Sequence, residues 1–135
     1  MKTIPVELPR QDDLNTALQL IAAKRPNGLV IVQDLVTFMV RERLAEFALQ
    51  NRLLATHAFR EFVVAGGLMS YGNSATDLFD TAAGYVERIL KGERPKDLPM
   101  EQPTRFQFVV NAQTATTLGL ILPQSILLFA DEVIR

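Results

Sequence analysis

The stretch at residues 66–77 constrains the fold most, because it joins a buried strand, a glycine turn and the start of a helix. Residues 68–71 are apolar enough for a buried strand. Asn73 or Ser74 can cap the following helix, and Ser74 with Asp77 fits a capping box. A helix N-terminus offers free N–H groups and a partial positive charge. The turn is therefore suited to an anionic or polar ligand, unless its glycines serve turn geometry alone.

Strand-like and helix-like segments alternate along the chain, as in a parallel sheet with right-handed crossovers. Clusters of β-branched and apolar residues predict strands at residues 4–8, 29–32, 53–56, 68–71 and 106–111. Helical spacing predicts helices from residue 12 or 13 to the stop at 25–28, and at 38–50, 59–65, 76–91, 114–118 and 124–134. We therefore expect an α/β fold with a doubly wound, mostly parallel sheet.

Two of these strands have a distinctive composition. Residues 29–32 form a continuous run of branched apolar residues, which predicts a strand that is covered on both faces. Residues 4–8 are flanked by Pro5 and Pro9, so we expect this strand to lie near an edge or to end early.

The helix at residues 76–91 has the clearest helical periodicity. Its broad apolar stripe consists of Leu78, Phe79, Ala82, Tyr85, Val86, Ile89 and Leu90. Gly92 is placed to end the helix. The following residues, 93–103, contain three prolines and are expected to form an extended, stiff connector.

The composition excludes several classes of function. With 135 residues, 48% of them apolar, the chain is long enough for one globular domain. The formal net charge of -1 and the absence of a basic block argue against nucleic-acid or membrane-surface partners. A chain with one histidine and no cysteine is not expected to hold a zinc ion or another cofactor. No apolar run has the length of a membrane span, and the N-terminus lacks the apolar core of a signal peptide.

Polar and aromatic side chains follow the predicted strands at their carboxyl ends, where α/β sheets bind ligands. The candidate ligand-binding residues are Gln33, Asp34, His57, Phe59, Tyr71, Asn73 and Asp77. Purely structural roles remain open for four of these residues. Asp34 and Asp77 can cap helices, His57 can be a hydrogen-bonded structural histidine, and Phe59 can be a packing residue. The chain has no Gly-x-Ser-x-Gly elbow or phosphate loop, which argues against a small flavodoxin-like or hydrolase-type enzyme.

Ordered motifs extend through most of the chain. They are Arg-Glu-Phe-Val-x-Ala-Gly-Gly-Leu at 60–68, Tyr-Gly-Asn-Ser-Ala-Thr-Asp-Leu-Phe at 71–79, Ala-Gly-Tyr-Val-Glu-Arg-Ile-Leu-Lys-Gly at 83–92, Lys-Asp-Leu-Pro at 96–99, Glu-Gln-Pro-Thr at 101–104 and Ala-Asp-Glu-Val-Ile at 130–134. Together they resemble the substrate-binding proteins of ABC transporters, in the branch whose characterised relatives bind amino acids such as tryptophan.

The resemblance implies the second lobe of a type I periplasmic-binding fold, in which a solute is held between two lobes that close about a hinge. It also implies a small-molecule solute such as an amino acid, an ABC permease as partner, a periplasmic location and no catalysis. The expected organisation is a strand–helix core at residues 1–75, a hinge-crossing helix and proline-rich connector at 76–104, and a final strand and helix at 105–135. Asn73 and Asp77 are expected in the hinge-side loop.

Family members are about twice as long, so we expect this chain to be the second lobe without the first. The stripe at residues 78–90 would then face water, and burying each such side chain is worth about 1.5–3 kcal/mol. We therefore expect a homo-oligomer formed through this helix face or through an open sheet edge. The mean hydropathy of +0.13 favours the same conclusion. The alternatives are a free-standing interaction module or a gene remnant without independent ligand binding.

Overall fold

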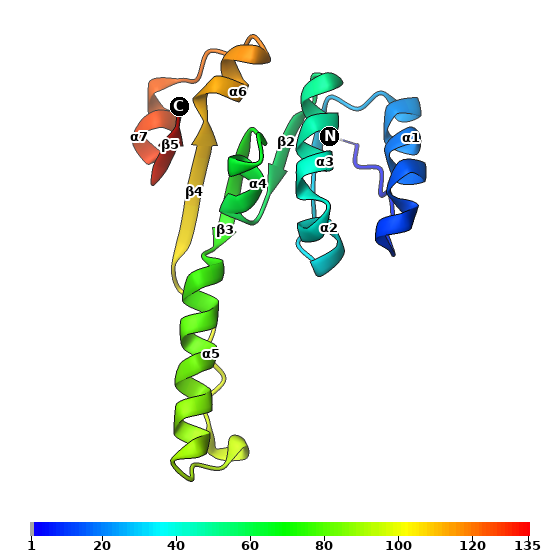
Figure 1. Ribbon diagram of the computed structural model, residues 1–135. Coiled ribbons are helices and arrows are strands. Elements are labelled where there is room, and N and C mark those ends of the chain that lie inside the picture. Colours follow the sequence, from blue (N-terminus) through cyan, green and yellow to red (C-terminus); the bar gives the residue numbers. More distant parts are fainter. Residues whose placement is uncertain (1) are drawn as a thin grey trace.

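The computed structural model describes residues 2–135 and contains helices, short 3-10 turns and one five-stranded sheet (Figure 1). The first half contains η1 (Gln11–Asp13), α1 (Leu14–Lys24), β1 (Gly28–Val30), α2 (Leu35–Met39), α3 (Arg41–Gln50), β2 (Leu54–His57), α4 (Arg60–Val64) and β3 (Met69–Asn73). The second half contains α5 (Ala75–Leu90), η2 (Pro95–Asp97), β4 (Phe106–Asn111), α6 (Ala112–Thr117), α7 (Gln124–Phe129) and β5 (Glu132–Ile134).

The strands lie in the order β1-β2-β3-β4-β5, and only the β3–β4 pair is antiparallel. The predicted α/β fold with a mostly parallel sheet is therefore confirmed. Short turns and helices connect the three parallel strands β1, β2 and β3, which places their carboxyl ends at one edge of the sheet.

The core lies between the sheet and the helices α1, α3 and α4. Leu14 and Ile21 of α1 pack with Leu44 of α3 and with Phe62 of α4, and all four side chains are buried. These positions repeat at helical spacing, so one face of each helix is removed from water. Gly66 has a φ of 100°, which ends α4 in the left-handed conformation expected of a glycine cap.

The expectation that residues 29–32 are covered on both faces is wrong. Leu29 and Ile31 face the core, whereas Val30 and Val32 are each 76% exposed. The reason is topological, because β1 is an edge strand and the helices pack on only one side of it. The same open face carries Tyr71 of β3, which pairs in register with Phe108 of β4.

The strand expected at residues 4–8 does not form, although Val6 and Leu8 still pack against the core. Pro5 and Pro9 have no N–H to donate to a ladder, so this segment packs through its side chains alone.

The helix expected at residues 38–50 is divided into α2 and α3 at Val40. α2 begins earlier because Asp34 and Thr37 form a capping box: the Asp34 Oδ1 accepts the Thr37 N–H at 2.9 Å, and the Thr37 Oγ1 accepts the Asp34 N–H at 3.1 Å.

The prediction of a helix at residues 124–134 is wrong for the second half of this segment. α7 ends at Phe129, and the last residues form β5 beside β4. Asp131 starts this pairing, because its N–H donates to the Phe108 carbonyl at 2.9 Å and its carboxylate accepts the Phe108 N–H at 2.7 Å. The free edge of β4 therefore determines the conformation of this segment.

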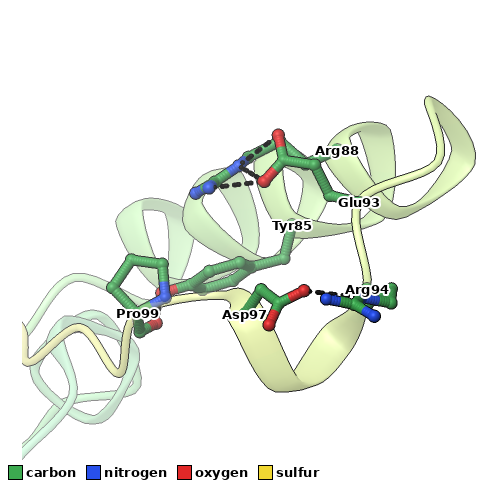
Figure 2. A network of polar contacts seen from close by, with 6 residues as sticks. All are labelled: Tyr85, Arg88, Glu93, Arg94, Asp97 and Pro99. Carbon is green, nitrogen blue, oxygen red and sulfur yellow. Dashed lines mark hydrogen bonds and ion pairs between the residues drawn. The ribbon is translucent and has the colours of Figure 1, made fainter.

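α5 projects away from the sheet, and the connector after it runs back along the helix (Figure 1). Figure 2 shows how the two are joined: the Tyr85 hydroxyl donates to the Pro99 carbonyl at 2.7 Å, and Arg88 pairs with Glu93. The connector covers one flank only. Phe79 and Leu90 remain 76% and 82% exposed, with the exposed Val86 between them. We call Phe79, Val86 and Leu90 the α5 ridge.

None of the helices within residues 2–135 has both the length and the apolar character needed to span a membrane.

Candidate functional site

Three loops lie side by side at the carboxyl edge of the sheet, as the alternation of strands and helices predicts. β1 pairs with β2 through Val30 and Thr56, and β2 pairs with β3 through His57 and Ser70. The segments that follow these strands therefore leave the sheet side by side. The seven predicted site residues lie at the ends of β2 and β3, in the segments that follow β1 and β2, and in the first turn of α5, and the structure gives them different surroundings.

The first loop contributes little that is free to contact a ligand. The Asp34 carboxylate is engaged as the N-cap of α2, which is the capping role that the sequence left open. Gln33 is exposed beside it.

His57 is a structural histidine at the end of β2. It is 3% exposed, it stacks on Phe62 at 5.5 Å, and its Nδ1 accepts the Phe59 N–H at 3.0 Å. Burial lowers the pKa of the imidazole, and the nearby Glu61 and Asp34 carboxylates offset this only in part. The ring is therefore neutral near pH 7, with its proton on Nε2, an atom with no hydrogen-bond partner within residues 2–135.

Phe59 lies in an aromatic cluster beside this histidine. Its ring meets the edge of Phe38 with the centroids 5.5 Å apart, and the Arg41 guanidinium lies 4.8 Å from the Phe38 centroid. Phe59 is only partly buried, so the cluster packs the loop and still offers an aromatic surface.

Tyr71 belongs to the other face of the sheet. It is 63% exposed and stacks on Phe106 at 5.6 Å. Because neighbouring residues of a strand point to opposite faces, Tyr71 points away from the side that α4 covers. Tyr71 is not among the residues that line the polar cavity described next.

A polar cavity of about 320 Å³ opens at the carboxyl edge of the sheet. It lies between the start of α4, the turn after β3 and the beginning of β4. Its lining residues are Arg60, Glu61, Asn73, Ser74, Ala75, Thr76 and Gln107. We call it the carboxyl-edge cavity. A second hollow, of about 170 Å³, is at the opposite end of the sheet and is lined by Ala22, Arg25, Pro26, Asn51 and Leu53.

Residues 72–74 lead from the end of β3 into α5, and Asn73 and Ser74 of this turn line the cavity. A Cβ on Gly72 would collide with the Ala58 carbonyl, so glycine is required for β2 and β3 to approach at this point. Ser74 then caps α5 as predicted, its Oγ accepting the Asp77 N–H at 3.2 Å. Ala75 and Thr76, whose N–H groups have no acceptor within the helix, line the cavity, whereas the Asp77 side chain does not.

Arg60 is the one cation among the residues that line this cavity, and it is already paired. Its Nε and Nη2 each donate to the Glu132 carboxylate at 2.6 Å, which joins α4 to β5. These hydrogen bonds raise the pKa of Arg60 and lower the pKa of Glu132. The charge of the guanidinium is therefore satisfied within the protein.

Two acceptor atoms in the lining have no partner within the described residues, 2–135. They are the Glu61 Oε2 and the Asn73 Oδ1, and both are buried. The lining therefore combines polar side chains with the N–H groups at the start of α5. Such an arrangement can bind a small polar solute, and in the same range no cluster of three or more carboxylate or imidazole groups is placed to hold a metal.

Of the seven predicted ligand-binding residues, only Asn73 lines this cavity, whereas Arg60, Glu61 and Gln107 line it without having been predicted. The position of Arg60 and Glu61, directly after β2, was the available signal. The sequence carries no such signal for Gln107. This residue lies beside the cavity because β4 pairs with β3 and places Gln107 opposite Gly72.

Comparison with known proteins identifies the family of this chain. The sequence model of the family described as "ABC transporter substrate binding protein" matches residues 1–134. Among curated proteins, none matches the sequence significantly.

Three solved structures share the fold. A conserved domain protein from Vibrio cholerae is 25% identical, with a TM-score of 0.85 over 93% of this chain and 42% of its own. The ABC domain from Streptococcus pneumonia in complex with L-Trp is 21% identical, with a TM-score of 0.85 over 94% of this chain and 44% of its own. A substrate-binding protein with adhesive properties from Clostridium difficile, in a ligand-free open form, is 18% identical, with a TM-score of 0.66 over 100% of this chain and 44% of its own. The chain thus spans less than half the length of each.

Proposed function

Because the chain belongs to the ABC transporter substrate-binding protein family, we propose that it is the solute-binding lobe of an ABC-type importer. Its fold matches part of periplasmic-binding-protein domains, which supports a role as one wall of a ligand cleft. In this proposal the solute is a small molecule such as an amino acid, the protein partner is an ABC permease, the location is periplasmic, and the chain catalyses no reaction.

The observation that carries the proposal is the carboxyl-edge cavity. It lies where α/β sheets bind ligands, and its lining consists mostly of polar side chains. Its volume of about 320 Å³ is at the lower limit of ordinary small-molecule sites. We assign Asn73 to solute contact in this cavity. The other predicted ligand-binding residues do not line this cavity, and we propose them as contacts in the wider cleft: Gln33, Asp34, His57, Phe59, Tyr71 and Asp77.

An amino-acid panel tests this function directly. The melting temperature of the purified chain is measured with each of the twenty standard amino acids, and with glucose and spermidine as solutes of other classes. We expect at least one amino acid to raise the melting temperature, because a ligand that binds only the folded state stabilises it. We expect Asn73→Ala to lose most of that rise. A panel in which no amino acid shifts the melting temperature contradicts the proposed function.

A second part of the proposal concerns a partner protein. The α5 ridge projects into solvent, and its apolar side chains lie at positions 79, 86 and 90 on one side of a long helix. We propose that a second copy of the chain covers this ridge, with the open sheet face and the free edge of β1 as the neighbouring contact surface. This surface is also the observation that favours the alternative function, a free-standing interaction module.

A further inference from the structure

The face of the sheet opposite α1, α3 and α4 is apolar and uncovered. We call it the open sheet face, and its exposed or partly exposed side chains are Val30, Val32, Leu54, Met69, Tyr71 and Phe106. A sheet face in contact with water normally carries polar residues, and parallel strands are normally covered on both faces. Within residues 2–135, the strands β1, β2, β3 and β4 direct no charged side chain to this face. The open sheet face therefore has the composition of a buried layer.

α5 carries an apolar ridge that has no surface to pack on. It is the longest helix, with 16 residues, yet none of its residues is buried within the described chain, 2–135. The helix belongs to an arm, residues 74–105, which leaves the sheet after Asn73 and returns to it at Phe106, the residue that pairs with Asn73. Hydrogen bonds between α5 and the connector hold the arm together, so it projects from the sheet as one unit (Figures 1 and 2).

The exposed area of the chain indicates how large the missing contact is. The chain exposes 9663 Å², whereas a folded monomer of 15.1 kDa exposes about 7,100 Å². The surplus of roughly 2,600 Å² exceeds the about 800 Å² that each partner buries in a stable dimer. Two α5 ridges packed on each other would cover only a strip of one helix and would leave the open sheet face in water. A contact that covers both surfaces accounts for more of the surplus.

We infer that the arm of each copy packs its α5 ridge on the open sheet face of a second copy. The inference rests on the proposed second-copy partner and specifies the surface that receives the ridge. In a two-fold dimer this contact occurs twice, because each copy supplies one arm and one sheet face. Each sheet then gains a helix on its uncovered side, which completes the layer arrangement of an α/β fold with helices on both faces.

Paramagnetic relaxation between two copies tests this inference. The chain has no cysteine, so Glu87→Cys, an exposed position next to Val86 of the ridge, provides a single thiol for a nitroxide label. The labelled chain is mixed with ¹⁵N-enriched wild-type chain in dilute solution and then concentrated, so that the copies exchange and any broadening arises between them. We expect the amide signals of Val30, Leu54 and Tyr71 to lose most of their intensity, and reduction of the nitroxide to restore them.

Broadening confined to residues 79–90 would indicate contact between two α5 helices and would overturn the inference while the second-copy partner stands. If light scattering shows a monomer at every concentration, the proposed partner itself fails, and the inference fails with it. The amino-acid panel is independent of both results, because it measures solute binding.

Two sets of substitutions then identify the two surfaces. The double variant Val32→Ser and Tyr71→Ser changes only the open sheet face, and the triple variant Phe79→Ser, Val86→Ser and Leu90→Ser changes only the ridge; all five side chains are exposed, so both variants should fold. We expect each variant alone to be monomeric in light scattering. A mixture of the two should recover a dimer, because the intact ridge of one can pack on the intact face of the other. A double variant that dimerises like the wild-type chain, or a mixture that stays monomeric, overturns the inference.

Discussion

Arg60 and Glu132 join the first turn of α4 to the last strand of the sheet through two hydrogen bonds of 2.6 Å. The two residues are 72 positions apart, and Arg60 also lines the carboxyl-edge cavity. Its geometry is bidentate, in which a guanidinium and a carboxylate match best. The pair thus fixes the position of α4, and with it the neighbouring Glu61.

We expect Arg60→Met to lower the free energy of unfolding by about 1 kcal/mol, because both partners are partly exposed and solvent weakens the pair. Urea denaturation monitored by circular dichroism measures the change. Arg94→Met, which removes a more exposed pair with Asp97 in the connector, is the matched control and should cost less. Equal effects of the two substitutions would show that the Arg60 pair has no special role.

The stability of the chain should depend on the protonation of His57. The folded-state pKa of His57 is below its ordinary value of 6.5, so the unfolded chain takes up the proton first as the pH falls. The contribution of the neutral ring is therefore complete above pH 6.5 and is lost progressively as the pH falls from there to the lowered folded-state pKa. Urea midpoints measured at several pH values between 8 and about 5 test this slope.

His57→Asn provides the comparison for that slope. Asparagine cannot titrate, so the variant should be less stable at every pH but should lack the loss of stability below pH 6.5. The same pH slope in both proteins would assign the effect to other groups.

We expect Gly72→Ala to destabilise the fold by about 1–3 kcal/mol, because the added methyl group meets the Ala58 backbone carbonyl in a well-packed site. Gly84→Ala is the matched control. Its Cβ would meet open space within α5, so this variant should be neutral or up to about 1 kcal/mol more stable. Melting curves should therefore show a lower melting temperature for Gly72→Ala and an unchanged or higher one for Gly84→Ala, and equal losses in both would contradict the close approach at Gly72.

The α5 ridge should govern self-association. We expect the wild-type chain to elute as a dimer or larger species in size-exclusion chromatography with light scattering, and the triple variant Phe79→Ser, Val86→Ser and Leu90→Ser to be monomeric. Ile121→Ser changes an exposed apolar side chain elsewhere and should leave the mass unchanged. A wild-type chain that is monomeric at all concentrations contradicts this partner.

Local sequence signals were sufficient for most of the fold. Helical spacing predicted the helix that starts at residue 12 or 13, which is α1, and the capping residues at 73 and 74 predicted the start of α5. Short-range chemistry determines these features, so they are readable in a single sequence.

The errors have long-range causes. Residues 132–134 form a strand because the edge of β4 is available to them, and no local signal carries that information. The exposure of Val30 follows from the position of β1 at the sheet edge. For the same reason Gln107 was missed, since its place in the cavity depends on pairing with Gly72, which is distant in sequence.

The most direct test of the central claim is an NMR titration of the ¹⁵N-labelled chain with the amino acid that gives the largest thermal shift. If the carboxyl-edge cavity binds the solute, the backbone amide shifts should concentrate at Arg60 and Glu61, at residues 73–76 and at Gln107. Shifts confined to the hollow near Arg25 and Asn51, or no saturable shifts at all, would contradict the account.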